Sequence, residues 1–396
     1  MSSSSRLVDF CRSEVEALQA AKTYKTERIL EGPTGARVRV DGREVLMLTS
    51  NNYLGFANHP RIVAAAQKAL TRWGNGLGSV RFICGTQELH KELESTIAAF
   101  FGQEDAILYM SCWNANEGLF QPLLSEVDAL LTDGLNHASI IDGVRLCKAK
   151  RFITPHGDLA AVEKALQEAT SARHRLFITD GVFSMEGEIG PLEELADLCD
   201  RYDTTLAVDD SHATGVLGAT GRGTAEELSV MHRIGLFTGT LGKAMGSAAG
   251  GFTTGPSAIV DLLRQRSRTT LFSNTLPPAV AAASLEAFRM LMEDPAPVAQ
   301  LRKNAMTFRT RMTAAGFQIP KGIHPIVPVI VGDTAKALAM SEALFQKGVY
   351  VSGFGFPVVP QGHARLRCQV SAVHTEADLD EAVSAFEAVG RDFGVI

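Results

Sequence analysis

Between residues 76 and 252, short apolar runs alternate with longer stretches of helical character, and this alternation limits the possible folds most strongly. The apolar runs are "DAILYM", "DALLTD", "RLFITD", "TTLAVDD" and "IGLFTG". Strands that are apolar throughout, and not only at every second residue, are typical of a parallel sheet covered by helices on both faces. The sequence therefore predicts an α/β fold of βαβ units around a large, mostly parallel sheet.

Polar residues follow directly on each of these runs. The segments are "SCWNANEG", "DGLNHAS", "DGVFSMEG", "DDSHATG" and "TGTLGK". In an open α/β sheet the carboxyl ends of the parallel strands meet at one edge and form the ligand crevice. Five strand ends that carry polar groups to that edge predict an active site there.

The segments on either side of this region have a different pattern. Helical spacing predicts a helix over about residues 8–21, and Asp41 and Gly42 within an alternating stretch predict a β-hairpin. Towards the C-terminus, "IVPVIVG" and "ARLRCQVSA" are typical of strands, and "TAKALAMSEALFQKG" is typical of a helix. We expect an N-terminal helix with a small β segment (1–58), a large α/β domain (59–285) and a smaller α+β domain (286–396).

Charge and cysteine usage exclude several classes of protein. A formal net charge of −6 and a pI near 6.0 leave no basic surplus for nucleic acid. The six cysteines are scattered singly, which fits neither a disulfide framework nor a zinc site and favours a reducing compartment. No apolar stretch approaches a membrane span, and the N-terminus has no long apolar segment of a signal peptide. We expect a cytoplasmic protein that binds neither nucleic acid nor membrane.

The common catalytic motifs are absent. Lys243 lies in "TGTLGKAMG", but Phe237 stands where a phosphate-binding P-loop needs its first glycine, and Ala244 follows the lysine in place of Ser or Thr. "GNGLGS" follows a helix, which argues against a dinucleotide-binding turn, and "GVFSMEG" lacks the spacing of a nucleophile elbow. Because no metal-ligand spacing is present either, we expect no metal.

An amine, an acid and two histidines remain, at the ends of three strands. Asp209 is followed three residues later by His212, His137 lies in "LNHAS", and Lys243 follows the last strand. Pyridoxal 5'-phosphate (PLP) needs a lysine that binds it as a Schiff base and a carboxylate that keeps its ring nitrogen protonated, so these residues suit that cofactor. Considered alone, Asp209 also suits a helix cap and His137 a structural hydrogen bond.

Nearly the whole chain resembles the α-oxoamine synthases of PLP fold type I, which have the aspartate aminotransferase-like architecture with a seven-stranded sheet. The resemblance rests on "NNYLG", "GLGSVRFICGTQELHKELE", "DGLNHASIIDGVRLCKAKR", "TDGVFSMEG", "VDDSHATG", "GTLGKAMG", "RSRTTLFSNTLPP" and "GFPVVPQGHARLRCQVSAVHT". "SVRFICGTQ" and "GVRLCKAKR" are most similar to the ketobutyrate ligase branch. The resemblance implies condensation of glycine with acetyl-CoA to 2-amino-3-oxobutanoate and CoA.

The resemblance implies a role for each polar strand end. Lys243 would bind PLP as a Schiff base and later take the α-proton of glycine. Asp209 would pair with the ring nitrogen and His137 would stack on the ring. His212 and Ser184 would contact the ring oxygen or the lysine-bound side of the cofactor. We also expect the glycines beside the lysine, Gly242 and Gly246, to let the backbone pass close to the cofactor.

The resemblance also implies how the phosphate is held. Within one chain, the contacts would come from Thr240, Ser111, Cys112 and Trp113. Ser273 and Asn274 match a segment that reaches the phosphate of a neighbouring subunit, so the chain would form a homodimer with shared active sites.

The amino-acid substrate would be held by Asn51, Ser184 and Arg367. A guanidinium suits a planar carboxylate. Two alternatives stay open: a sister synthase that uses alanine, serine or a longer acyl-CoA, and a catalytically silent subunit of the same fold, against which the lysine, the acid and the histidine together count. The phosphate turn departs from the ligase pattern at Trp113, Asn114 and Glu117, so the length of the acyl chain is the least determined property.

Overall fold

The centre of the protein is a seven-stranded sheet with the strand order β3-β11-β10-β9-β6-β4-β5. This computed structural model describes residues 4–21 and 23–396; residues 1–3 and Lys22, which belong to the expected N-terminal part, lie outside the described residues. The strands are β3 (Asp105–Tyr109), β11 (Gly251–Gly255), β10 (Leu236–Thr240), β9 (Thr205–Asp209), β6 (Arg175–Asp180), β4 (Ala129–Asp133) and β5 (Lys150–Thr154). β11 is antiparallel to both of its neighbours and the other pairings are parallel, which confirms the predicted sheet.

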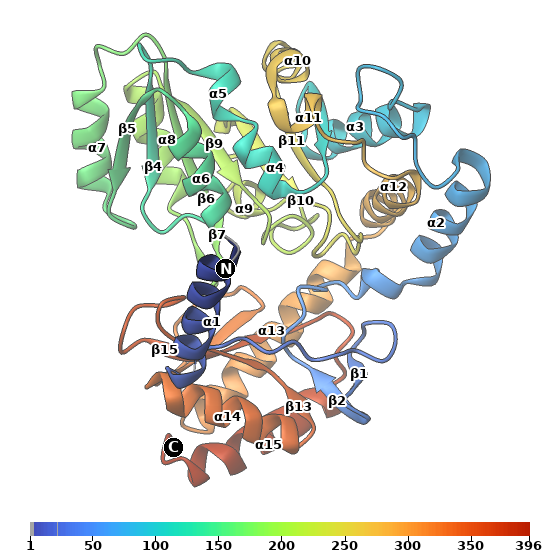
Figure 1. Cartoon of the computed structure of the whole chain (residues 1–396), viewed down its shortest axis with the longest axis vertical. Coiled ribbons are helices and arrows are strands. Elements are labelled where there is room, and N and C mark those ends of the chain that lie inside the picture. The colour runs from blue at the N-terminus through green and yellow to red at the C-terminus, as the bar shows by residue number, and fades with distance from the viewer. Residues whose placement is uncertain (1–3, 22) are drawn as a thin grey trace.

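Helices cover this sheet on both faces (Figure 1). They are α3 (Glu88–Phe101), α4 (Cys112–Glu117), α5 (Phe120–Leu123), α6 (Ala138–Leu146), α7 (Leu159–Glu168), α8 (Leu192–Arg201), α9 (Thr224–Glu227), α10 (Ser257–Arg266), α11 (Arg268–Leu271) and α12 (Pro278–Glu293), with α2 (Pro60–Trp73) packed against α12. Neighbouring residues of β10 belong to different core clusters: Leu236 packs with Ile178, and Phe237 packs with Phe101 and Phe252. Because both faces of each strand are buried, the strands are apolar throughout.

The carboxyl ends of β3, β10, β9, β6 and β4 lie at one edge of the sheet. β3 runs in the same direction as β10, since both pair antiparallel with β11. β6 and β9 are in parallel register, so that Asp180 lies beside Asp209 at the end of the two strands. The predicted convergence of the five polar segments is therefore confirmed.

The N-terminal hairpin belongs to the core of the C-terminal part. β1 (Arg37–Val40) and β2 (Arg43–Met47) are joined by Asp41 and Gly42, whose φ angles of 51° and 75° are those of a two-residue hairpin turn. On its other edge, β2 pairs in parallel with β13 (Val349–Tyr350). Leu46 of β2 lies in one core cluster with Leu366 and Phe386. The remaining elements of this part are α13 (Ala296–Ala314), β12 (Ile326–Gly332), α14 (Thr334–Gln346), β14 (Ser352–Phe354), β15 (Ala364–Gln369) and α15 (Glu376–Asp392). The domain boundaries at 58/59 and 285/286 stay a prediction.

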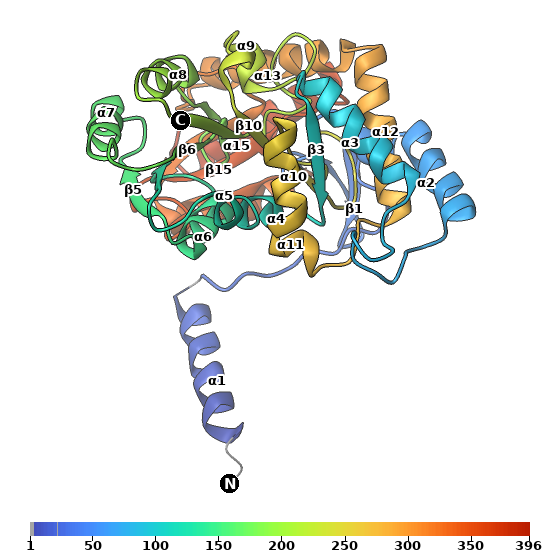
Figure 2. The ribbon, with the colours of Figure 1, turned by 90° about the horizontal axis from the view of Figure 1, so that it is seen from above.

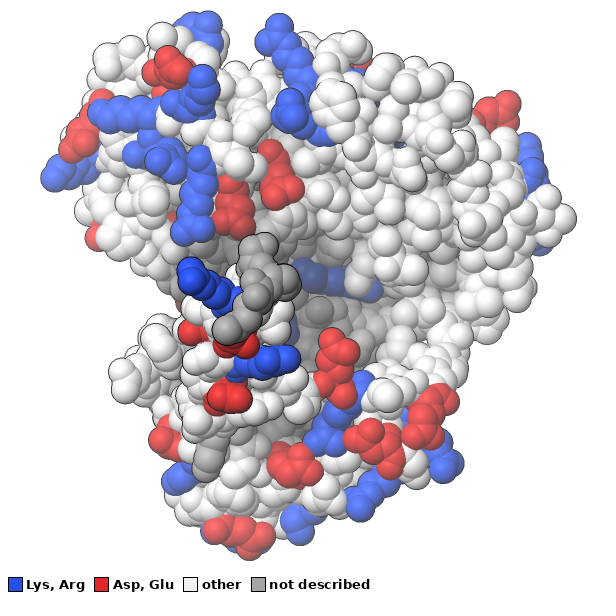
Figure 3. All heavy atoms as spheres, viewed as in Figure 1, with Lys and Arg blue, Asp and Glu red and all other residues white. Residues whose placement is uncertain are grey.

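The predicted N-terminal helix is present as α1 (Ser4–Ala20) and projects away from the rest of the chain (Figure 2). Its apolar side chains are exposed, Leu7 by 66% and Phe10 by 59%. In the space-filling view the surface is hollowed between the upper and lower parts, and acidic and basic side chains are interspersed on this face (Figure 3). Within residues 4–21 and 23–396, no helix combines the length and the apolar character that crossing a membrane requires.

Candidate active site

A cavity of about 200 Å³ lies at the carboxyl edge of the sheet, between the ends of five strands. Nine of the residues predicted from the sequence line it: Ser111, Cys112, Trp113, His137, Ser184, Asp209, His212, Thr240 and Lys243. Their elements are far apart in the sequence, so the fold alone brings the amine, the acid and the two histidines into one cavity.

Four predicted residues do not line this cavity. Ser273 is half-buried and Asn274 is exposed, and Asn274 pairs through its backbone with Val80. Asn51 is half-buried and Arg367 is buried, and neither contributes to the lining of the cavity.

Three further lining residues were not predicted: Ser139, Asp180 and Ser211. Asp180 accepts the backbone N–H of His137 at 2.6 Å through Oδ2, and burial raises the pKa of this carboxyl well above its usual range. The neutral acid is therefore favoured at Asp180. The signal was present in the sequence, because Asp180 ends the apolar run "RLFITD" as Asp209 ends "TLAVD".

N–H groups orient both oxygens of the Asp209 side chain. Its Oδ1 accepts the backbone N–H of Ser211 at 2.9 Å, and its Oδ2 accepts from Asn116 Nδ2 at 2.6 Å. Cys112 Sγ lies 3.6 Å from the same Oδ2, and burial raises the pKa of that thiol well above its usual range, which keeps it protonated. Both oxygens of Asp209 therefore have N–H donors, which fix the side chain in the cavity.

Lys243 begins the turn that follows β10. Burial lowers the pKa of its amine, while the charge of Asp209 opposes that shift. The neutral amine, which can act as nucleophile or base, is therefore more populated than in an exposed lysine.

The two glycines beside this lysine differ in how closely other residues pack against them. Gly246 has φ 66°, and a Cβ there would lie 2.5 Å from the backbone carbon of Phe56, so the glycine is needed for packing against residues 56 and 57. A Cβ at Gly242 would meet only ordinary contacts at 3.6 Å or more. At Gly246 the constraint comes from the protein's own backbone, and the close approach of both glycines to the cofactor stays a prediction.

His137 is neutral and its ring is oriented. Its Nδ1 accepts the backbone N–H of Ser139 at 3.2 Å and lies 2.8 Å from Ser139 Oγ. Burial lowers the pKa of the imidazole. The indole of Trp113 meets this ring edge-on, with 6.0 Å between centroids.

His212 is neutral for the same reason. Burial lowers its pKa well below the usual range, and the cationic groups of Lys243 and Arg367 add to the shift. Its partner is Tyr53, a residue of "NNYLG" that was not singled out as functional.

Arg367 carries unpaired hydrogen-bond donors. It is 7% exposed, and its Nε and Nη2 have no hydrogen-bond partner within the described part of the chain. Gln369, two residues further along β15 and on the same face, donates to Asn51 Oδ1. A buried guanidinium with two free donors beside an asparagine fits an anionic, planar ligand such as a carboxylate.

The donor set fits PLP. The cofactor needs an amine, an anion for its ring nitrogen, a flat group for the ring face and hydrogen-bond donors for the phosphate. Lys243, Asp209 and His137 meet the first three needs, and Ser111 and Thr240 add hydroxyl groups to the same cavity. Among residues 4–21 and 23–396, no group of three or more His, Cys, Asp or Glu side chains is placed to hold a metal ion.

A seven-stranded, mostly parallel sheet with these groups at its carboxyl edge defines the class of PLP-dependent enzymes of fold type I. Residues 43–386 match the family described as aminotransferase class I and II. One relative is the mitochondrial 2-amino-3-ketobutyrate coenzyme A ligase of Bos taurus, to which the chain is 50% identical over 385 residues. This alignment covers 97% of the chain and 92% of the relative. It is 49% identical over 387 residues, 97% of both chains, to the 2-amino-3-ketobutyrate coenzyme A ligase of Escherichia coli (strain K12).

Among solved structures, a serine palmitoyltransferase from S. paucimobilis with bound PLP and myriocin superposes with a TM-score of 0.92, at 28% identity over 98% of both chains. The chain belongs to the PLP-dependent α-oxoamine synthase family.

Proposed function

We propose that this protein condenses glycine with acetyl-CoA, giving 2-amino-3-oxobutanoate and CoA, with PLP as cofactor. The observation that carries the proposal is one cavity that combines Lys243, Asp209 and His137 in a chain half-identical to ketobutyrate ligases. An electron sink for the carbanion at Cα of the amino acid is the chemistry that PLP supplies when bound.

The chain's own residues would bind and orient the reactants. Lys243 would attach the cofactor and, as a neutral amine, accept the Cα proton at Nζ. Asp209, with donors on both oxygens, would hold the proton on the ring nitrogen. His137 would lie on the ring face, with Trp113 against its edge to exclude water.

The remaining contacts follow the same assignment. His212 and Ser184 would contact the ring oxygen and the lysine-bound side as neutral hydrogen-bonding groups. The phosphate contacts would come from Ser111, Cys112, Trp113 and Thr240. Arg367 and Asn51, with Ser184, would bind the substrate carboxylate, supported by the unpaired donors of the guanidinium.

We propose further that the chain forms a homodimer whose active sites are completed across the interface. Ser273 and Asn274 lie outside their own chain's cavity, beside the strongly exposed Phe272, while Phe82 and Ile83 are 64% and 69% exposed. Apolar side chains of this size, next to one another in two loops, mark a contact surface.

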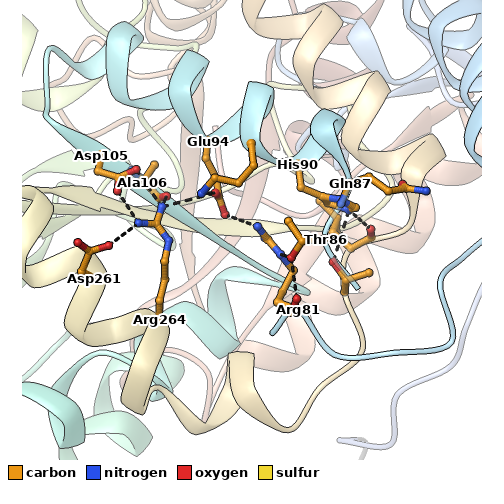
Figure 4. A network of polar contacts seen from close by, with 12 residues as sticks. Arg81, Thr86, Gln87, His90, Glu94, Asp105, Ala106, Asp261 and Arg264 are labelled. Carbon is orange, nitrogen blue, oxygen red and sulfur yellow. Dashed lines mark hydrogen bonds and ion pairs between the residues drawn. The ribbon is translucent and has the colours of Figure 1, made fainter. Parts of the chain in front are cut away.

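The two loops are held together and anchored. Thr275 N–H donates to Ser79 O at 3.2 Å, and Glu94, which is 1% exposed, pairs with Arg81 at 2.8 Å and with Arg264 at 3.5 Å (Figure 4). The exposed apolar face of α1 adds surface for a second copy, because most of the stability of a helix in a protein comes from packing of its apolar face.

We infer a cytoplasmic location. All six cysteines are free thiols, four of them buried, which fits a reducing compartment. Fractionation of cells that produce the protein tests this inference.

The experiment that tests the function is a panel of acyl-CoA donors with glycine, alanine and serine, read by release of free thiol. We expect the highest rate with acetyl-CoA and glycine. Activity confined to donors longer than acetyl, or to alanine or serine, would instead identify a sister synthase, for which the partly exposed Trp113 in the cavity wall is the residue to examine. Purified protein without cofactor absorbance, or absorbance unchanged in Lys243→Ala, would identify a silent subunit.

A further inference from the structure

The side chain of Asn116 lies at the centre of a buried polar chain behind the cavity. Asn116 has no exposed surface, and no part of the proposed function uses it. Its Nδ2 lies 2.6 Å from Asp209 Oδ2 and 2.9 Å from Ser139 Oγ, and its Oδ1 accepts from Thr238 Oγ1 at 2.9 Å. One amide therefore contacts α6, β9 and β10.

The orientation of this amide is fixed by its partners. Asp209 as a carboxylate offers only acceptors, so the group that faces it at 2.6 Å has to be the NH₂ end. Thr238 is fully buried and its hydroxyl donates to the carbonyl end. A flipped amide would place two acceptors against each other at Asp209 and lose the bond to that carboxyl group.

The second N–H of the amide acts on His137 through the hydroxyl group of Ser139, which adds a donor to that of the Ser139 backbone. Asn116 donates to Ser139 Oγ, so the hydroxyl proton of Ser139 is free to donate to His137 Nδ1 at 2.8 Å. The backbone N–H of Ser139 also donates to Nδ1. Because Nδ1 accepts both bonds, the ring proton of the neutral imidazole lies on Nε2.

We propose that Asn116 is a positioning residue that, through one oriented amide, orients the side chain of Asp209 and, together with the backbone N–H of Ser139, holds the ring proton of His137 on Nε2. The inference rests on the proposed function, because the two residues that it orients are the ones assigned to the cofactor ring. A change at Asn116 should therefore alter both contacts to the ring together, although Asn116 touches neither cofactor nor substrate.

Asn116→Asp tests the hydrogen bond to Asp209, because it exchanges the donor for an acceptor with little change in side-chain size. Two carboxylates side by side favour protonation of one of them, which removes the charge that pairs with the ring nitrogen. We expect the dissociation constant of PLP, measured by titration of the cofactor-free protein, to rise about tenfold or more. Thr238→Val, which removes only the donor that orients the amide, should raise it about threefold.

¹⁵N NMR of histidine-labelled, cofactor-free protein tests the effect on His137, because it reports which ring nitrogen carries the proton. The wild type should show a single state with the proton on Nε2, and Asn116→Asp and Ser139→Ala should each give a mixture of tautomers. A purely structural role would not change the tautomer. The matched control is Asn304→Asp, which changes another buried amide, one that donates to the carbonyls of Ser371 and His374. It should leave the dissociation constant of PLP within about twofold of the wild type and the His137 tautomer unchanged.

The inference is wrong if Asn116→Asp and Thr238→Val, both folded, bind PLP as the wild type does and keep the single His137 tautomer. If the wild type itself binds no PLP, the proposed function fails. In that case, the tautomer of His137 in the four variants still decides whether Asn116 orients it.

Discussion

Tyr53 Oη lies 2.9 Å from Nδ1 of His212, and the two side chains are 0% and 7% exposed. Burial raises the pKa of Tyr53 to about 12 and lowers that of His212, so the bond joins two neutral groups. The same hydroxyl lies 3.3 Å from Asn51 Oδ1. Tyr53 thus connects the histidine of the cavity to a residue assigned to the substrate carboxylate.

Tyr53→Phe should lower kcat/KM for the amino acid about tenfold, because both His212 and Asn51 lose a buried hydrogen-bond partner. The free energy of unfolding should fall by about 1–2 kcal/mol. Steady-state kinetics and urea unfolding measure the two effects. The control is Tyr109→Phe, since Tyr109 is also buried but its hydroxyl has no partner among the described residues. Equal effects of the two variants on kcat/KM would contradict the prediction.

Trp113→Ala should relax the selection for short acyl donors. Trp113 lines the cavity, is 39% exposed and meets the edge of His137, so its removal opens space beside the ring face. We expect the ratio of kcat/KM for a longer acyl-CoA to that for acetyl-CoA to rise about tenfold or more. Trp113→Phe keeps an aromatic wall and should change this ratio less than about threefold. A ratio that stays constant in Trp113→Ala would place the acyl chain elsewhere.

Complementation of two inactive chains should restore activity if the sites are shared. Lys243→Ala removes the amine, and the double variant Ser273→Ala, Asn274→Ala removes the groups assigned to the partner's phosphate. Mixed and reassembled one to one, half of the dimers are hybrids with one intact site, so about a quarter of the wild-type activity should return. Mixtures as inactive as their components would show that each chain forms its site alone.

Stability should fall in mild acid because of two buried, neutral histidines. His374 accepts the backbone N–H of Ser371 at Nδ1 and bonds Met47 O through Nε2, and His324 is bound in the same manner by Ile326 N–H and His212 O. Burial lowers the pKa of His374 to about 4 and that of His324 to about 3.

The direction of this pH dependence follows from the protons that the unfolded chain takes up. Between these values and about 6.5 the unfolded chain binds more protons than the folded one, so stability is lost as the pH falls, by up to about 1.4 kcal/mol per pH unit for each histidine. His374→Gln removes the part of this pH-dependent loss of stability that His374 causes. Urea unfolding between pH 4.5 and 6.5 should therefore give a difference in stability between wild type and variant that shrinks as the pH falls. Parallel curves would contradict the assignment.

Gly246→Ala should be far more destabilising than Gly242→Ala. At Gly246 a methyl group would combine a left-handed backbone with an approach of 2.5 Å to the backbone of Phe56, whereas at Gly242 it meets only ordinary contacts. We expect a loss of about 2–4 kcal/mol for Gly246→Ala and under about 1 kcal/mol for Gly242→Ala. Thermal unfolding of the cofactor-free proteins separates the two. A comparable loss in both variants would show that the turn itself, and not the contact with Phe56, sets the requirement.

The sequence predicted the sheet and most of the cavity because both depend on local pattern. Continuous apolar runs mark strands buried on both faces, and the residues after them reach one edge in any parallel sheet. Asp180 was overlooked although it carries the same signal as Asp209, and its register beside Asp209 became evident only in the sheet. The contact of Gly246 with Phe56 was not predicted, since Phe56 lies about 190 residues away in sequence and no local pattern indicates the contact.

The sequence by itself determined the fold class, the lysine, the acid and the histidines at the strand ends, and through its motifs the family. Only the tertiary structure decided how these groups are oriented. Tyr53 bonds His212 across 159 positions, Asn116 bonds Asp209 across 93, and Gln369 bonds Asn51 across 318. The physical reason is that side-chain hydrogen bonds depend on distance and direction within a few tenths of an ångström, which packing of separate elements sets and which periodicity along one segment does not encode.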